Sequence, residues 1–281
     1  MADIKPADVK RLREKTGAGI LDCKKALVDA EGDFAKAEKL LKEQGLAAAS
    51  KRSDRATNEG RVFTKIDGTK AGILELACET DFVARNDNFK NAGAELLDSI
   101  MEENLTEMTD SLEENVKLVI SKIKENISVK RFKTLEVADN ELCVDYIHGE
   151  GGIGVLVKIA ADNKTLLSND ELKQFAFDCA LHIAAFNPLF LSQDKVDAAY
   201  TQEQTEIFTK QAENLEKPAN VLQGIVKGKL NKHFSQICLL DQPFVKDDKS
   251  SLANVLAALG KKIGGTLSIA DFAYFRVGEE F

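Results

Sequence analysis

Apolar residues recur at helical spacing through the first 45 residues and predict a bundle of three short helices. Pro6 suits the first turn of the first helix, and Asp33 suits the N-cap of the third. Gly45 is expected to end the third helix, and residues 47–55 follow as a polar connector, helical or irregular. The segments expected to be helical are 6–16, 20–31 and 34–44.

The pattern changes after residue 60, where apolar and polar residues alternate as they do in β-strands. Residues 62–66 alternate, Asp67 and Gly68 make a typical hairpin turn, and residues 71–78 return as a second strand. After a short polar loop, two amphipathic helices are expected over residues 87–100 and about 111–126.

A similar order of elements recurs 82 residues later. Residues 144–148 and 153–159 are expected to be strands, joined by a glycine-rich turn at 149–152 and followed by a helix over 171–186. The repeated strand–turn–strand–helix order predicts two related α+β halves. The fold class is therefore α+β, with a three-helix N-terminal domain before a core of two related subdomains.

A long polar segment interrupts the second half. Residues 194–232 are rich in helix-forming residues and broken near Pro218, which predicts a helical hairpin. An apolar segment at 237–240, a helix over 251–259 and a strand over 266–277 would complete that half. The expected domains are residues 1–55, 56–140, 141–193 together with 233–281, and the inserted hairpin 194–232.

Composition narrows the function classes. The net charge of −8 argues against a dedicated nucleic-acid binder, although residues 1–55 alone carry +3. No long apolar run or N-terminal signal is present, so we expect a cytoplasmic protein without a membrane span. Five scattered cysteines and three scattered histidines have no metal-ligand spacing, so reduced, buried thiols and no metal or cofactor are expected.

The catalytic motifs are weak or missing. Gly149, Gly151 and Gly154 match the dinucleotide fingerprint in spacing, but a strand follows them where a helix would be needed. We therefore interpret them as a hairpin turn. No phosphate-binding loop and no nucleophile–base motif occurs, and the paired carboxylates lie in polar surroundings typical of a solvated face. An enzyme that makes or breaks covalent bonds is not indicated.

Residues 79–86 (ETDFVARN) form the unusual segment of the chain. They lie between a predicted strand and a predicted helix, where loops often carry function. Phe82 could be a plug in the protein's own core. It could equally be an exposed aromatic wedge, with Asp81 beside it, that fits a pocket of a partner.

The motifs in order resemble those of the bacterial elongation factor Ts family. Residues 16–27 (TGAGILDCKKAL) resemble its N-terminal signature, and residues 79–86 resemble its second signature. Shorter similarities continue through 146–157, 242–245 and 275–279, so the resemblance spans nearly the whole chain.

The resemblance implies a guanine-nucleotide exchange factor for elongation factor Tu, with no covalent chemistry of its own. It implies a ubiquitin-associated-like N-terminal domain and an inserted helical hairpin, and it leaves room for a 2:2 assembly through that hairpin. The loop that disturbs the partner's Mg²⁺ site would comprise Thr80, Asp81, Phe82 and Val83. The candidate docking residues would be Arg13, Ile20, Leu21, Lys24, His148 and Val245.

Two expectations limit the resemblance. Family members commonly continue past the strand at 266–277 into a C-terminal helix that touches the partner, so no such contact is expected from this sequence. The competing interpretation is a ubiquitin-associated-like adaptor or an RNA-binding module that uses the basic N-terminal segment. It predicts salt-sensitive RNA binding and gives residues 80–83 no role.

Overall fold

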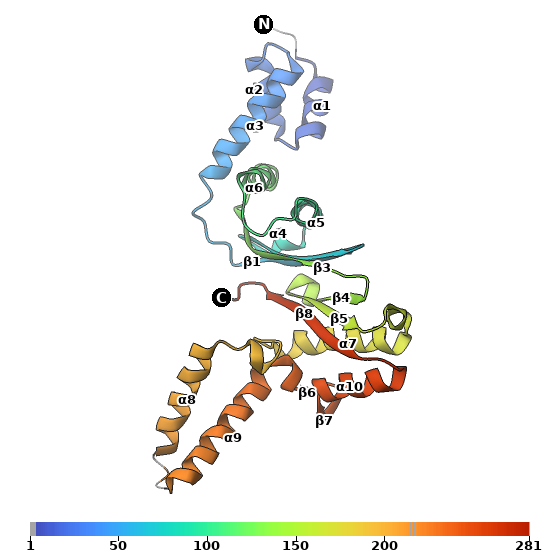
Figure 1. Ribbon diagram of the computed structural model, residues 1–281. Helices are drawn as coiled ribbons and strands as arrows, with labels where there is room; N and C mark the ends of the chain where they lie inside the picture. Colours follow the sequence, from blue (N-terminus) through green and yellow to red (C-terminus); the bar gives the residue numbers. More distant parts are fainter. Residues whose placement is uncertain (1–3, 214, 216, 281) are drawn as a thin grey trace.

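The structure is a computed structural model that describes residues 4–213, 215 and 217–280. Its parts follow one another along an elongated molecule (Figure 1). A helical bundle lies at one end, two β-sheets lie in the middle, and a helical hairpin projects at the other end. This arrangement confirms the predicted α+β fold class.

The N-terminal bundle packs three amphipathic helices around a small apolar core. Its helices are α1 (Pro6–Thr16), α2 (Ile20–Asp29) and α3 (Phe34–Ser50). Leu12, Cys23 and Ala37, one from each helix, are fully buried in this core. Gly17 ends α1 in the left-handed conformation, which glycine adopts without strain, and so turns the chain into α2.

The predicted end of the third helix at Gly45 is wrong, because α3 continues to Ser50. A Cβ atom at Gly45 would lie 2.8 Å from the Cβ of Ser121 on the neighbouring helix α6. Gly45 therefore permits a close approach of two helices rather than a stop. Ala49, one turn later, is buried in the core of the first α+β half.

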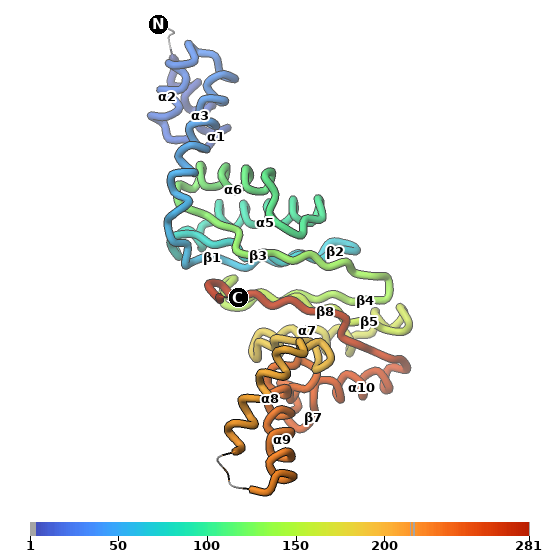
Figure 2. Tube along the Cα trace, turned by 60° about the vertical axis from the view of Figure 1, so that its left-hand side comes forward, coloured from blue at the N-terminus to red at the C-terminus, as the bar shows by residue number. Residues whose placement is uncertain are grey.

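The first α+β half has a three-stranded antiparallel sheet covered on one face by two long helices, α5 and α6, with the short helix α4 before them (Figure 2). The strands are β1 (Glu59–Asp67), β2 (Lys70–Cys78) and β3 (Ile127–Glu136), with β2 in the centre, and the helices are α4 (Asp81–Arg85), α5 (Asp87–Glu102) and α6 (Asp110–Ile123). Leu74 and Leu76 of β2 pack against Phe89, Leu97 and Ile120 of the helices. Strand β3 is not among the elements that the sequence predicts.

The second half repeats this arrangement. Its sheet contains β4 (Glu141–His148), β5 (Ile153–Ala161) and β8 (Leu267–Arg276), and its further elements are α7 (Asp170–Phe186), the short pair β6 (Pro243–Phe244) and β7 (Asp247–Ser251), and α10 (Leu252–Ile263). The turn between β4 and β5 is a short 3-10 segment with Gly149 and Gly151 at positive φ. The match to the dinucleotide fingerprint is thus a hairpin turn, as predicted.

The structural repeat has an offset of 83 residues rather than 82. Asn86 and Asn169 are equivalent N-caps of α5 and α7. The bulges after Glu75 and after Lys158 are also 83 residues apart. The two halves therefore share a bulge and a helix cap as well as the order of elements.

The two sheets pack face to face in the middle of the molecule. Ile73 of β2, Leu156 of β5 and Phe275 of β8 share the core between them. A Cβ atom at Gly154 would lie 2.3 Å from Cγ1 of Val62, so this glycine permits the sheets to approach closely. Strand β2 is buried on both faces, which explains why residues 71–78 are almost continuously apolar.

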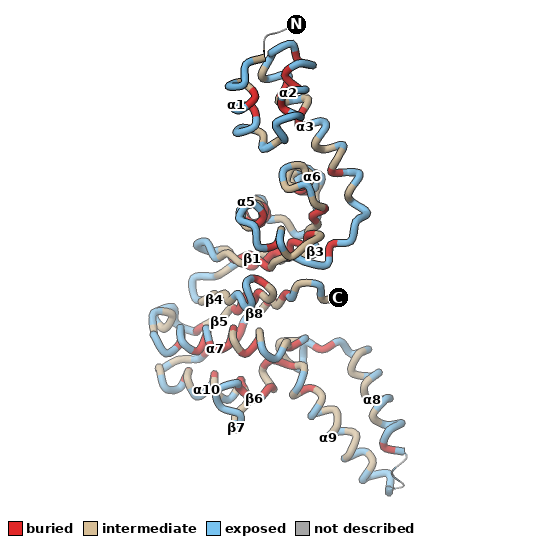
Figure 3. Tube along the Cα trace, turned by 180° about the vertical axis from the view of Figure 1, so that it is seen from behind, coloured by how far each residue is buried: buried red, intermediate tan, exposed pale blue. Residues whose placement is uncertain are grey.

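The predicted helical hairpin is confirmed as α8 (Ala198–Glu213) and α9 (Ala219–Ile237), with Pro218 at the N-terminus of α9. It is mostly exposed or half-buried, whereas buried residues concentrate in the facing sheets (Figure 3). Its base packs through Val196, Phe234 and Cys238.

Candidate partner-binding surfaces

Residues 79–86 are a braced helical turn rather than the irregular loop that the sequence predicts. Helix α4 contains five residues and begins after Thr80, whose Oγ1 accepts a hydrogen bond from the Val83 amide at 3.4 Å. Asn86 ends α4 and caps α5 through its side-chain oxygen, which accepts from the Asn88 amide at 2.8 Å. The segment is thereby held at both ends.

Phe82 points away from the protein. Its side chain is 82% exposed, whereas Ala84 is buried and Val83 packs against the core of the first half. The inward side of the turn is thus occupied by Val83 and Ala84. The plug interpretation of Phe82 is therefore wrong, and the exposed aromatic wedge remains.

Asp81 and His148 come together although they are far apart in sequence. Both line a hollow of about 440 Å³ between α4 and the β4–β5 turn, together with Arg85 and Glu150. Arg85 lies 3.5 Å from Asp81 and 3.8 Å from Glu150. These ion pairs are exposed, so each contributes about 1 kcal/mol or less and leaves Asp81 available to a partner.

His148 is held by an aromatic neighbour. The Tyr146 hydroxyl lies 2.9 Å from Nδ1 of His148, and the Tyr146 ring meets Phe177 edge-on with centroids 5.9 Å apart. His148 and Phe177 are both exposed. Tyr146 belongs to the family-like segment 146–157, but neither Tyr146 nor Phe177 was among the candidate docking residues.

The N-terminal docking candidates form one surface on α1 and α2. Arg13, Ile20 and Lys24 line a hollow of about 480 Å³ that also contains Pro6 and Val9. Leu21 lies beside Ile20 in sequence and is 81% exposed, and Ile20 is 56% exposed. Two exposed apolar side chains with a basic rim suit a partner surface that is apolar and acidic.

Val245 lies in the turn between β6 and β7 and is exposed. Its amide donates to Nδ1 of His182 at 3.2 Å, and Nε2 of His182 lies 2.8 Å from the side-chain oxygen of Gln242. Because the Val245 amide can only donate, the imidazole proton lies on Nε2. Burial lowers the pKa of His182 and favours this neutral form. His182 is thus a structural support that the sequence did not reveal.

The candidate residues therefore occupy three separate places. Arg13, Ile20, Leu21 and Lys24 lie in the bundle, Thr80 to Val83 and His148 lie beside the two sheets, and Val245 lies beyond the second sheet. These elements are spread along the length of the molecule (Figure 1). A small molecule cannot contact all three places at once, whereas a large protein can.

The thiols do not suggest chemistry. Four of the cysteines are buried and Cys143 is half-buried. Burial raises the pKa values of Cys78, Cys143 and Cys179 to about 12. Such thiols stay protonated at neutral pH and are poor nucleophiles.

The described residues contain neither a metal-ligand cluster nor a membrane-spanning helix. Within residues 4–213, 215 and 217–280, no group of three or more His, Cys, Asp or Glu side chains is arranged to hold a metal ion. Over the same part of the chain, no helix combines the length and apolar character needed to cross a bilayer.

Comparison with known proteins gives a consistent result. The family model described as elongation factor TS matches residues 79–279. Elongation factor Ts of Treponema denticola is 45% identical over 276 residues, which cover 98% of this chain and 99% of that protein. Elongation factor Ts of Borreliella burgdorferi is 46% identical over 279 residues, which cover 99% and 100%. This chain belongs to the elongation factor Ts family.

Proposed function

We propose that this chain is the guanine-nucleotide exchange factor for elongation factor Tu during translation elongation in the cytoplasm. It binds the GDP-bound GTPase, inserts the turn Thr80–Asp81–Phe82–Val83 and promotes release of GDP so that GTP can bind. The observation that carries the proposal is the exposure of Phe82, 82%, on a turn whose Val83 and Ala84 side chains pack against the core. Membership of the family supports it.

The wedge acts on the partner's metal ion. Mg²⁺ neutralises the phosphates of the nucleotide, so a wedge that shifts the helices lining that site weakens the binding of both. The exchange factor and the nucleotide then each lower the other's affinity for the GTPase, and both affinities fall by the same ratio. No covalent bond changes, and this chain needs neither a metal nor a cofactor of its own.

The wedge cannot act alone. Accelerating release ~10⁴-fold lowers the barrier by roughly 5.5 kcal/mol, whereas burying one phenylalanine supplies about 1.5–3 kcal/mol. Residues 1–55 are therefore proposed as a docking domain that acts through Arg13, Ile20, Leu21 and Lys24. His148 and Val245 are proposed to extend the contact along the second half.

The hairpin is a second surface for assembly. Ile207 on α8 and Val221 on α9 are exposed apolar side chains. A 2:2 assembly through residues 194–232 would bury them. Light scattering of the factor with its partner would give a mass of four chains in that case and of two chains otherwise.

The decisive experiment measures release of a fluorescent GDP analogue from purified elongation factor Tu. We expect acceleration at substoichiometric amounts of this chain, because an exchange factor turns over. Unchanged release with folded protein would overturn the proposal. Salt-sensitive RNA binding in place of acceleration would favour the adaptor or RNA-binding alternative.

A further inference from the structure

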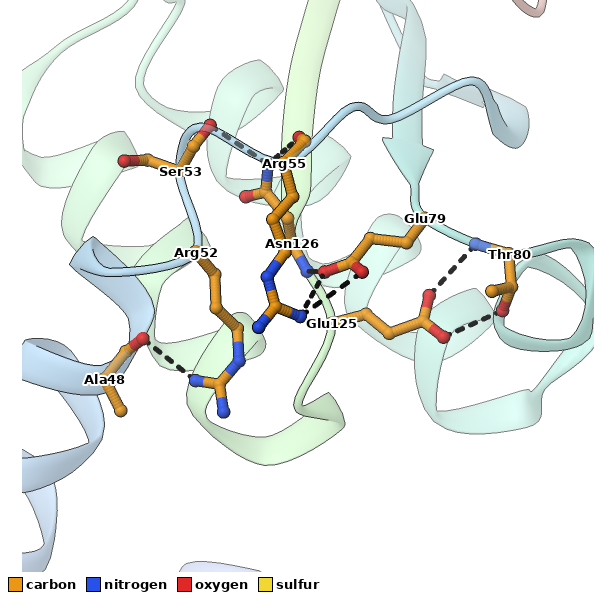
Figure 4. Close-up of polar contacts among 8 residues, drawn as sticks. All are labelled: Ala48, Arg52, Ser53, Arg55, Glu79, Thr80, Glu125 and Asn126. Carbon is orange, nitrogen blue, oxygen red and sulfur yellow. Dashed lines mark hydrogen bonds and ion pairs between the residues drawn. The ribbon is translucent and has the colours of Figure 1, made fainter.

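The turn between α6 and β3, residues 124–126, holds the base of the wedge. Glu125 accepts two hydrogen bonds from Thr80, one from the amide to Oε2 at 3.1 Å and one from the hydroxyl to Oε1 at 2.8 Å. Figure 4 shows the Glu125 carboxylate directed at Thr80, with Glu79 beside it. Thr80 is separated from Glu125 by 45 residues of sequence, so this contact joins two distant segments.

The contact fixes the helix cap. Because the Thr80 hydroxyl donates its one hydrogen to Glu125, its lone pairs face the Val83 amide, which donates to it at 3.4 Å. Thr80 also accepts a backbone hydrogen bond from the Ala84 amide at 3.2 Å. A helix of five residues is not stable by itself, so it depends on such external contacts.

The same turn holds the connector from the N-terminal bundle. The buried side chain of Asn126 donates to the carbonyl oxygens of Ser53 at 3.1 Å and Arg55 at 2.7 Å. The backbone amide of Asn126 donates to the Glu79 carboxylate at 2.6 Å, and the Arg55 guanidinium lies 3.3 Å from the same carboxylate. Two residues of one turn therefore bind both the wedge and the end of the connector (Figure 4).

We infer that Glu125 and Asn126 are positioning residues for nucleotide exchange, an inference that rests on the proposed function. They hold Phe82 at a fixed place relative to the N-terminal bundle, so that docking of the bundle delivers the wedge. A mobile wedge would have to be ordered during the reaction, at a cost in conformational entropy. Glu125 itself does not touch the partner in this proposal.

The test separates the rate of release from the affinity. Glu125→Ala removes the two carboxylate oxygens that accept hydrogen bonds from the Thr80 amide and hydroxyl. We expect the maximal rate of GDP release at saturating factor to fall about tenfold, while the factor concentration that gives half the maximal rate changes less than threefold. Glu125→Gln keeps one acceptor oxygen, and its maximal rate should stay within about threefold of wild type.

The matched control is Glu113→Ala on α6, the helix that precedes the turn. Glu113 is exposed and pairs with Lys117 at 3.5 Å, so its loss changes the charge equally without touching the wedge. Amide hydrogen exchange gives a direct readout of position. Val83 and Ala84 should exchange faster in Glu125→Ala than in wild type, and at the wild-type rate in Glu113→Ala.

The outcomes distinguish the two proposals. If wild-type protein does not accelerate release, the proposed function is overturned and this inference with it. If wild-type protein accelerates release and Glu125→Ala matches its maximal rate, this inference alone is overturned. An equal loss of rate in Glu113→Ala would also contradict it, because a general effect of charge or stability would then explain both variants.

Discussion

Phe82 combines a largely exposed side chain with a backbone that is held at both ends, so its removal tests the wedge alone. Because the Phe82 side chain is largely exposed, Phe82→Ala removes little buried apolar surface from the free protein. The free energy of unfolding of the variant should therefore stay within about 0.5 kcal/mol of wild type. GDP release from elongation factor Tu should slow at least tenfold. Met108→Ala removes another exposed apolar side chain and should leave release unchanged. A folded Phe82→Ala protein with normal exchange would remove the wedge from the mechanism.

His182 makes stability depend on pH. Its pKa is lowered by burial, so the unfolded chain takes up a proton near pH 6.5 while the folded chain does not. Stability is therefore fully present above about pH 6.5 and is lost as the pH falls below it, by at most about 1.4 kcal/mol per pH unit. Denaturant unfolding at pH 7.5 and 5.5 should show this loss, and His182→Asn should reduce it. Equal losses in both proteins would exclude His182 as the cause.

Two properties of single residues could not be predicted from the sequence, namely the direction of the Phe82 ring and the supporting role of His182. The signature at 79–86 marked Phe82 as unusual, but the direction of its ring depends on which neighbour fills the inward side of the turn. Val83 and Ala84 fill it. His182 looked like an ordinary histidine, because its partners Gln242 and Val245 lie about 60 residues away.

At the scale of elements, Gly45 lies inside a helix at a close helix contact, although its position in the sequence predicts a helix end. A glycine after an amphipathic segment predicts a helix end, and the close approach of α3 to α6 gives the opposite result. Ala is normally worth about 1 kcal/mol more than Gly within a helix. Here Gly45→Ala should lower the free energy of unfolding, because its Cβ would clash with Ser121. A double-mutant cycle with Ser121→Gly should show a coupling of at least about 0.5 kcal/mol, and additive effects would contradict the contact.

Strand β3 escaped the sequence analysis for a similar local reason. Ile127 and Val129 alternate with polar residues, but Lys130 is an extra residue in the pairing with β2, since Leu76 pairs with Val129 and Glu75 with Arg131. The bulge shifts the alternation by one residue, so no period of two runs through the strand. Strands β1, β2, β4 and β5 have no extra residue and were predicted. Strand β8 was predicted although it has the equivalent bulge, since Lys158 pairs with Asp271 and Ile159 with Ile269.

At the scale of the whole molecule, a network of ion pairs and hydrogen bonds around Arg131 helps to join the two halves. Glu75 in β2 is fully buried, lies 2.7 Å from Arg131, and accepts a hydrogen bond from the Gly278 amide at 3.0 Å. Arg131 also lies 3.4 Å from Glu279. Glu75→Ala should therefore cost about 3 kcal/mol of unfolding free energy, because it removes the closest carboxylate from a largely buried guanidinium.

A second ion pair between the halves provides the control. Lys133 lies 2.9 Å from Asp271, and both side chains are about 40% exposed. Lys133→Ala should cost about 1 kcal/mol or less, since solvent screens that pair. Urea unfolding of the two variants measures both values. Similar costs would show that burial of Glu75 does not govern the strength of the contact.

The internal repeat predicted two related halves, but it did not predict how the two halves pack against each other. Packing the sheets face to face needs a small residue where they approach most closely, and Gly154 opposite Val62 supplies it. Nothing in the sequence distinguishes this glycine from its neighbours in the turn. The order of elements is thus encoded locally, whereas the approach of the halves depends on pairs of residues from different halves.

The distance between the bundle and the wedge leads to the last prediction. Ile20 and Leu21 lie on the bundle, so changing both to Ser should weaken docking without altering the wedge. Each apolar side chain buried by a partner is worth about 1.5–3 kcal/mol, so the factor concentration for half-maximal release should rise at least tenfold. The maximal rate should stay at the wild-type value. Val28→Ser, an exposed change on the same helix, should alter neither quantity. A lower maximal rate in the Ile20 and Leu21 variant would show that the bundle acts on the nucleotide site itself, and docking and wedging would then not be separate steps.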